Sequence, residues 1–194
     1  MIENIGTIRW VKYTALGLLL ITGTSPAYQT VTESRPRMIA AASMAGCTDP
    51  NIQGFAWLQE RSSEEGIKTV DVFVGVRGLP PGKHAVHIHE QGQCEPCANA
   101  GGHFDPGPAG NSNPDANHPY HSGDLPNIEV NAQGIGTVWA ITTRVTLSAG
   151  PLSIFDADGS AIVIHVNPDT YCPGGEQSGC AGGGRAACGR LTRQ

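Results

Sequence analysis

The alternation in residues 69–77 is the sequence feature that most restricts the fold. Four valines occupy every second position from Val70 to Val76, and an aspartate, a phenylalanine and a glycine lie between them. Because successive side chains of a β-strand point to opposite faces, this pattern predicts a strand with one buried face. Shorter patterns of the same kind recur along the chain, and 26 glycines and 14 prolines favour turns between them. The sequence therefore predicts an all-β fold.

We expect about eight short strands in one domain of residues 37–191. The segments with strand patterns are residues 38 onward, 52–60, 69–77, 84–90, 128–130, 136–142, 145–147, 161–166 and 185–191. No internal repeat is visible, and short strands with loop insertions favour a β-sandwich or a Greek-key barrel. We expect residues 28–36 to form a flexible lead-in and residues 192–194 to form a tail.

Residues 1–27 have the features of a signal peptide. Arg9 and Lys12 precede an apolar run at residues 14–22, and a pattern of small residues suitable for cleavage follows at 25–27. The run is too short to span a bilayer. We therefore expect cleavage and secretion into the periplasm or the extracellular space, with an uncleaved N-terminal anchor as the alternative.

The charge of the chain limits its partners. The formal net charge is -5 at neutral pH, and no block of lysines or arginines is present. We therefore expect no nucleic-acid partner and, for the mature form, no membrane partner.

Six cysteines suit an oxidising compartment and favour disulfides. Cys94 and Cys97 could instead form a redox-active pair, but no strand and helix pattern follows them.

Six of the seven histidines lie within residues 84–124. Much of this region lacks periodicity, and so long a segment inside a compact domain is usually functional or disordered. His87 and His89 are two positions apart in a predicted strand, so their imidazoles share one face, although solvated surface histidines are the alternative. The seventh histidine, His165, lies in another predicted strand. We expect residues 91–126 to form a functional loop held by metal and disulfides.

The side chains of this region allow two metal sites. Neutral imidazole suits copper and zinc, and three histidines with one aspartate make a closed zinc site. The first set offers four nitrogens, from His87, His89, His103 and His165. The second offers three nitrogens and an oxygen, from His103, His118, His121 and Asp124. His103 is common to both sets.

Five motifs, in this order, resemble those of the secreted copper/zinc superoxide dismutases. They are GKHAVHIHE at residues 82–90, GGHFDP at 101–106, HSGDLP at 121–126, IHV at 164–166 and GRAACG at 184–189. The resemblance implies an eight-stranded Greek-key β-barrel of immunoglobulin-like sandwich architecture, which is the known architecture of that family, with long metal-binding and electrostatic loops. It also implies the dismutation of superoxide to oxygen and hydrogen peroxide, by copper that is bridged through a histidine to zinc.

The resemblance also assigns roles to single residues. The implied copper ligands are His87, His89, His165 and His103, and His103 bridges to zinc and takes up a proton in the reaction. His121 and Asp124 match zinc ligands. Asp169 matches the aspartate that links a copper-ligand histidine to a zinc-ligand histidine. His84 matches a histidine that is not a ligand, and we expect it to be a buried structural residue.

The sequence departs from the family at Asn111. Family members usually have a zinc-ligand histidine at this place after the bridging histidine. His118 lies three residues before His121, and we expect it to supply the missing nitrogen through a rearranged loop. The alternative is that His118 is merely exposed and that zinc binds weakly or not at all.

Arg185 matches the active-site arginine of the family. A guanidinium stays charged at any working pH and can guide superoxide, a small anion, to a negatively charged protein, and superoxide dismutase is itself a known example of such steering. A solvated surface arginine is the alternative.

A copper-buffering protein on the same scaffold is the second hypothesis for function, and it would not need Arg185. An adhesion module would not need the ordered histidines. The resemblance leaves both a monomer and a homodimer open.

The resemblance implies a disulfide at Cys188, which matches the cysteine that fixes the loop ahead of the bridging histidine. Both Cys94 and Cys97 are candidate partners, and we favour Cys94. We expect Cys172 to pair with Cys180 inside a glycine-rich loop. Cys47 and Cys97 would then remain to pair with each other.

Overall fold

The structure is a computed structural model of the chain and describes residues 37–63, 65–107 and 110–194. The signal peptide expected at residues 1–27 and the lead-in expected at residues 28–36 lie outside the described residues. Among the described residues, no helix has the length and apolar character needed to cross a membrane.

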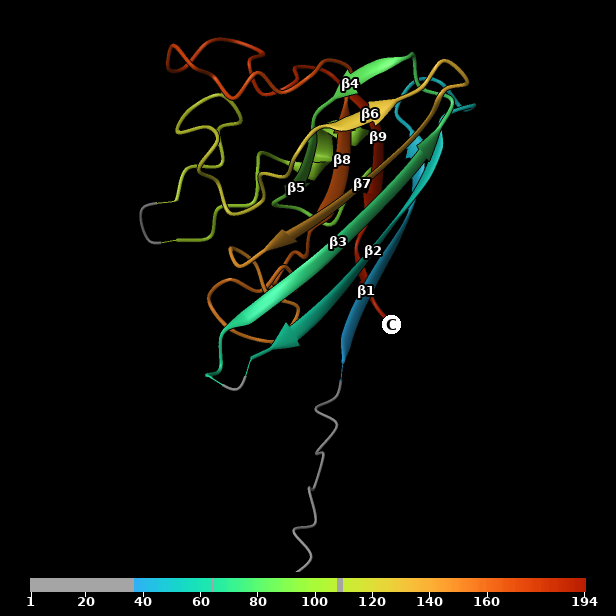
Figure 1. The fold of residues 1–194 in the computed structure, drawn as a ribbon. Helices are drawn as coiled ribbons and strands as arrows, with labels where there is room; N and C mark the ends of the chain where they lie inside the picture. The colour runs from blue at the N-terminus through green and yellow to red at the C-terminus, as the bar shows by residue number, and fades with distance from the viewer. Residues whose placement is uncertain (1–36, 64, 108–109) are drawn as a thin grey trace, which may run out of the picture. The chain divides into compact units, whose positions relative to one another are not determined.

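The described chain is built almost entirely from β-strands (Figure 1). They are β1 (Met38–Gly46), β2 (Gln53–Ser62), β3 (Lys68–Arg77), β4 (Gly82–His84), β5 (Val86–His89), β6 (Ile128–Val130), β7 (Ile135–Thr142), β8 (Ala161–His165), β9 (Arg185–Arg190) and β10 (Thr192–Arg193). A single 3-10 turn, η1 (Cys97–Ala100), is the helical element of the described residues. The all-β prediction is confirmed.

The strands form one antiparallel sheet that nearly closes into a barrel (Figure 1). Their order is β4-β6-β7-β3-β2-β1-β9-β8-β5, and β10 pairs with β1 outside this path. The two ends of the order, β4 and β5, are consecutive in the chain and are separated by Ala85. When β4 and β5 are counted as one interrupted strand, the nine strands of the order become the eight that were expected. The neighbours β3 and β7, and β1 and β9, are joined by long crossovers, as in a Greek key.

The strand predicted at residues 84–90 is interrupted at Ala85. The backbone N–H of Ala85 donates to the carbonyl oxygen of Asn167 (2.9 Å), and the carbonyl of Ala85 accepts from the N–H of His165 (2.9 Å). As a result β4 pairs with β6, whereas β5 pairs with β8. One edge of β5 has no strand partner, and this edge receives the functional loop described below.

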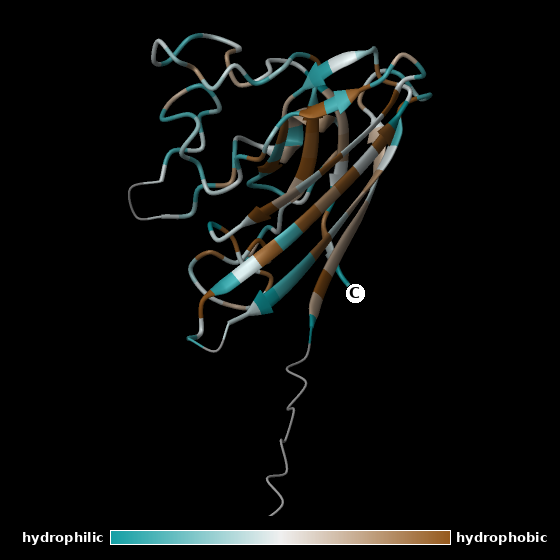
Figure 2. Cartoon of the chain, in the orientation of Figure 1, coloured by the Kyte–Doolittle hydropathy of each residue, from teal (hydrophilic) through white to brown (hydrophobic). Residues whose placement is uncertain are grey.

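The alternating valines fill the barrel as predicted. Val70, Val72, Val74 and Val76 of β3 are each at most 5% exposed. Phe73, which lies between them, points to the opposite face, where it meets the exposed Trp139 of β7 at a ring distance of 6.1 Å. Hydrophobic residues concentrate on the strands, whereas the long loops are mostly hydrophilic or neutral (Figure 2).

The prediction of a strand at residues 145–147 is wrong. Thr146 makes only an isolated bridge with Ser153. The two apolar side chains of this segment are fully buried, so the alternation did indicate a buried face. The backbone N–H of Leu147, however, donates to the Glu60 carboxylate (2.7 Å) instead of a neighbouring strand. The buried carboxylate of Glu60 thus accepts the hydrogen bond that a neighbouring strand would otherwise accept.

Candidate metal centre

Two adjacent strands carry three of the histidines. His87 and His89 lie on β5 and His165 lies on β8, and each is at most 2% exposed. The two strands are hydrogen-bonded neighbours. Their backbone therefore fixes the distance between the three imidazoles.

The loop at residues 90–127 lies along the free edge of β5. The N–H of Ile88 donates to the carbonyl of Gly123 (2.9 Å), and the N–H of Phe104 donates to the carbonyl of Ile88 (2.9 Å). The approach requires glycine, because a Cβ at Gly123 would lie 2.2 Å from the Ile88 oxygen. The contacts bring loop residues opposite strand residues in two bridges, His89 with His103 and His87 with Asp124.

We call the first cluster the four-histidine group: His87, His89, His103 and His165. One ring nitrogen of each lies within 4.8 Å of the others. The Nε2 atoms of His89 and His165 face each other at 3.2 Å. The Nδ1 atoms of the same rings face carbonyl oxygens, of Gly101 (3.0 Å) and Gly183 (2.9 Å). Since a carbonyl only accepts, each Nδ1 carries the proton, and two unprotonated Nε2 atoms are left pointing at each other.

Two further nitrogens of this group are buried without a partner, His87 Nδ1 and His103 Nε2. The other nitrogen of each ring faces a carboxylate: His87 Nε2 is 3.3 Å from Asp169 Oδ2, and His103 Nδ1 is 2.7 Å from Asp124 Oδ1. Unpaired buried acceptors are costly. Four unprotonated nitrogens that converge in this way are suited to bind a cation.

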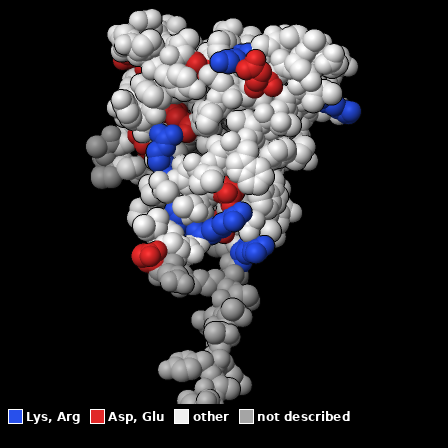
Figure 3. Space-filling model, viewed as in Figure 1, with Lys and Arg blue, Asp and Glu red and all other residues white. Residues whose placement is uncertain are grey.

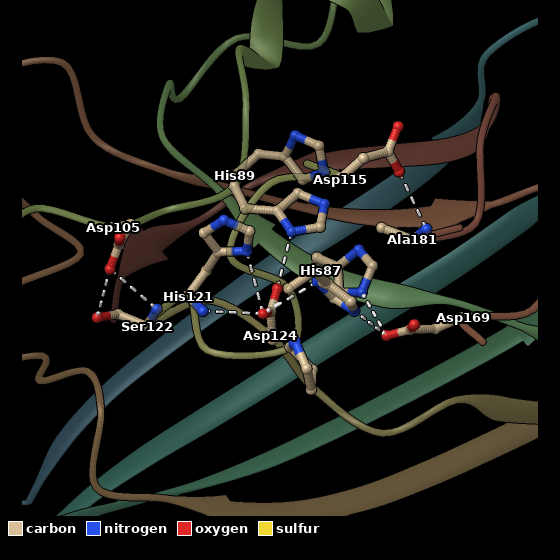
Figure 4. Close-up of polar contacts among 12 residues, drawn as sticks. His87, His89, Asp105, Asp115, His121, Ser122, Asp124, Asp169 and Ala181 are labelled. Carbon is tan, nitrogen blue, oxygen red and sulfur yellow. Dashed lines mark hydrogen bonds and ion pairs between the residues drawn. The ribbon is translucent and has the colours of Figure 1, made fainter. Parts of the chain in front are cut away.

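We call the second cluster the carboxylate group: His103, His118, His121 and Asp124. Three Nδ1 atoms meet the carboxylate of Asp124, from His103 at 2.7 Å and from His118 and His121 at 3.1 Å each (Figure 4). All four side chains are buried. A set of ligand atoms that all lie within 4.8 Å of one another here contains His87 in place of His121. His121 Nδ1 contacts Asp124 directly, at 3.1 Å, so the structure places His121 beside the other three members, and its role as a ligand stays a prediction.

His118 lies beside Asp124 in the structure, and its role as a zinc ligand stays a prediction. It is 6% exposed, which disagrees with the alternative of an exposed side chain. Its Nε2 is 2.7 Å from Asp169 Oδ2, on the side opposite to Asp124. Asn111 is exposed, and its side-chain oxygen accepts from the backbone N–H of Asn113 (3.0 Å). Asn111 is thus turned to its own loop.

Asp169 and His84 are both buried beside the metal-site histidines. Asp169 Oδ2 contacts both His87 and His118 and so joins the two groups (Figure 4). His84 is buried, and its ring nitrogens lie 2.9 Å from the carbonyl oxygens of His165 and Pro80. His84 belongs to neither group and braces the backbone of β8.

Arg185 is half-buried at the start of β9. Its guanidinium donates to the carbonyls of Cys97 and Gly101. Gly101 also accepts from His89, so the arginine and the four-histidine group share one segment of the loop. The positive charge of Arg185 lowers the pKa of both His89 and His165, in addition to the larger effect of burial.

Three disulfides fix the loops to the barrel. They are Cys47–Cys97, Cys94–Cys188 and Cys172–Cys180. These are the three pairs favoured in the sequence analysis, of which the resemblance implied only the disulfide at Cys188. Cys94 and Cys97 bond to different partners, so the redox-pair alternative does not agree with the structure. Because Cys97 also accepts from Arg185, its disulfide steadies the carbonyl that orients the guanidinium.

Burial decides the charge of the four-histidine group in the metal-free protein. It lowers the pKa of each of the four rings, to about 4 for His103 and to about 3 for His165. These imidazoles are therefore neutral at neutral pH, which is the form that binds metal. His118 differs: burial acts to lower its pKa, but hydrogen bonds with Asp124 and Asp169 outweigh burial and raise it to about 9.

Comparison with known proteins agrees with this geometry. The family model described as copper/zinc superoxide dismutase (SODC) matches residues 52–191. The chain belongs to the copper/zinc superoxide dismutase family. Copper and zinc are the metals of this family, and the two groups fit them: converging neutral imidazoles suit copper, and three Nδ1 atoms around a carboxylate suit tetrahedral zinc.

Two curated relatives are named superoxide dismutase [Cu-Zn]. That of Caulobacter vibrioides is 41% identical over 121 residues, which are 59% of this chain and 66% of that protein. That of Deinococcus radiodurans is 41% identical over 132 residues, which are 61% of this chain and 68% of that protein. The match thus spans about two thirds of these dismutases. A crystal structure of the clock protein EA4 shares the fold, with a TM-score of 0.58 and 27% identity, and covers 79% of this chain and 92% of its own.

Sequence reasoning missed several residues that position the site. Glu90 accepts from the backbone N–H of Gly102 (2.8 Å), the second residue of the motif that carries His103. Asn127 brackets Asp169 by accepting from its N–H (2.8 Å) and donating to its carbonyl (2.9 Å). Arg144 contacts two carbonyls of the loop. All three side chains form hydrogen bonds with backbone atoms. Such contacts cannot be recognised from the spacing of residue types in the sequence.

The metal-free protein should lose stability as the pH falls from about 6.5 to about 5. The unfolded chain protonates its histidines near pH 6.5, whereas the lowered pKa values of the four-histidine group keep these rings neutral in the folded protein. Each ring can remove up to about 1.4 kcal/mol per pH unit from the free energy of unfolding. The raised pKa of His118 acts elsewhere, because its contribution is complete below pH 6.5 and is lost as the pH rises toward 9. Urea unfolding of the metal-free protein at several pH values measures this, and a free energy that does not fall would contradict it.

Proposed function

We propose that the protein dismutates two superoxide anions, with two protons, to oxygen and hydrogen peroxide. The four-histidine group would hold copper and the carboxylate group would hold zinc. The observation that carries the proposal is the placement of His103 between the groups: its Nδ1 is 2.7 Å from Asp124, and its Nε2 is buried and unpaired among the other three imidazoles. Family membership and the names of the two curated relatives support the same activity.

The bound metals and the histidines that hold them would have separate roles in the reaction. Bound copper supplies one-electron redox chemistry, and bound zinc, which has none, supplies charge and rigidity. His89 and His165 keep their Nδ1 protons on carbonyl oxygens, so that both Nε2 atoms stay available to the metal. Nε2 is the free atom of His103 and is the place where this ring would hold a proton destined for the product. Nδ1 meanwhile stays with the carboxylate group.

Arg185 would guide the substrate. The chain has a net charge of -5, and Lys and Arg side chains lie singly or in small groups on the face shown in Figure 3. A local positive charge is therefore needed to attract an anion to the site. The carbonyls of Cys97 and Gly101 orient the guanidinium beside the four-histidine group. A copper-buffering protein, the second candidate, would have no need of such a charge.

The place of action would be the periplasm or the exterior of the cell, reached through the signal sequence of residues 1–27. Three disulfides among the described residues support an oxidising compartment. The protein would work as a monomer or a homodimer on superoxide alone.

The metal-loaded protein should remove superoxide at a rate near the diffusion limit, for which superoxide dismutases are a standard example. Stopped-flow decay of superoxide measures the rate. Removal of copper should abolish it, and return of copper should restore it. Slow decay at full copper occupancy would contradict the dismutase activity but not the fold or the copper ligands. It would assign the protein to copper buffering.

Replacement of His118 by alanine should lower the zinc content, because one of three nitrogens around Asp124 is lost. Copper content should change little. Asn111→Ala is the matched control, since Asn111 is exposed and turned to its own loop, and it should keep the zinc content of the unaltered protein. Metal analysis after dialysis against a weak chelator gives both values. Unchanged zinc in His118→Ala would remove this histidine from the zinc site.

Arg185→Glu should slow superoxide decay by on the order of tenfold or more and should invert part of the salt dependence, because attraction of the anion becomes repulsion. Lys83→Glu is a control of equal charge change at an exposed position of β4, and it should have a smaller effect. Rates at several ionic strengths, with copper content measured in each variant, test this. Equal rates in Arg185→Glu and the unaltered protein would refute the steering role.

A further inference from the structure

The segment from His118 to Asp124 must be held in a defined position for its side chains to meet. It carries three members of the carboxylate group, and we expect its His118 to supply the nitrogen that family members usually take from position 111. Seven residues of loop must therefore present two imidazoles and a carboxylate to one point. The end of the segment, at Gly123 and Asp124, pairs with the edge of β5, whereas residues 118–122 lie in no strand. This first part of the segment needs a further support.

Arg144 reaches this segment from another part of the chain. Its guanidinium donates through one nitrogen to the carbonyl of Pro119 (3.1 Å) and through the other to the carbonyl of Asp124 (2.5 Å). Pro119 directly follows His118, and Asp124 is itself a member of the group. One side chain thus bridges both ends of the ligand segment, with His121 between them.

The base of Arg144 is firmly held. It follows β7, and its backbone N–H donates to the hydroxyl of Thr142 (3.1 Å). The next residue, Val145, is fully buried in the core. Among the described residues Arg144 forms no ion pair with a carboxylate, so its charge is directed at the two carbonyls. Charged donors make the stronger hydrogen bonds, and the planar fork of a guanidinium can serve two acceptors at once.

We propose that Arg144 is a positioning residue of the zinc site, which holds His118, His121 and Asp124 in their binding arrangement through the carbonyls of Pro119 and Asp124. The inference rests on the proposed assignment of zinc to the carboxylate group. Residues that orient ligands in this way typically change metal affinity by about 10- to 100-fold when they are replaced.

The test is the zinc affinity of Arg144→Met and Arg144→Lys, measured by competition with a chromogenic chelator. Arg144→Met should bind zinc about 10- to 100-fold more weakly, with a much smaller change in copper affinity. Arg144→Lys should recover only part of the loss, because an ammonium is a point charge and cannot span both carbonyls. Cobalt(II) bound in place of zinc should show an altered visible spectrum in Arg144→Met, which a change in overall stability would not produce.

Arg77→Met is the control, since Arg77 is an exposed arginine whose side chain contacts Gln53 on another part of the barrel. It should leave zinc affinity and the cobalt spectrum unchanged. Equal affinity and an equal spectrum in Arg144→Met would overturn the role of Arg144 alone. If Arg144→Met does not fold, an unchanged affinity in Arg144→Lys would overturn it. Failure of the unaltered protein to bind zinc or cobalt would overturn the zinc assignment, and the inference with it.

Discussion

The buried carboxylate of Asp124 is the interaction on which the rest of the site depends. It is 3% exposed, and an uncompensated charge at such a place would cost on the order of several kcal/mol. Three imidazole Nδ1 atoms surround it, and their hydrogen bonds hold its pKa far below the ordinary range although burial acts to raise it. In the metal-free protein the imidazolium of His118 provides the balancing charge, because its pKa is about 9. The observed fold of the loop therefore compensates this buried charge by bringing the three rings to the carboxylate.

The barrel provides the other half of the arrangement. The interruption at Ala85 gives β5 one strand partner and one free edge, and the loop completes that edge with backbone hydrogen bonds. Two histidines of β5 and one of β8 thereby stay fixed while the loop brings His103 to them. The same loop segment carries the carbonyls that orient Arg185. The charge that would attract substrate and the ligands that would hold copper thus have a common support.

Periodicity made the fold and the strand histidines predictable, since both depend on which way successive side chains point. The strand expected at residues 145–147 failed because alternation indicates burial and does not identify the hydrogen-bond partner, which is Glu60 here. The position of His118 could be predicted only because a family pattern made the asparagine at position 111 conspicuous. Arg144 could not be predicted, because it binds backbone carbonyls, which every residue offers.

Asp169 has a consequence for how the two proposed metal sites would fill. Its Oδ2 atom contacts His87 of one group and His118 of the other, and His103 belongs to both groups. Sites that share side chains are thermodynamically linked, and linkage between binding equilibria is reciprocal. The factor by which zinc changes the affinity for copper must equal the factor by which copper changes the affinity for zinc. The total free energy of loading is then independent of the order in which the ions arrive, even where the individual steps are unequal.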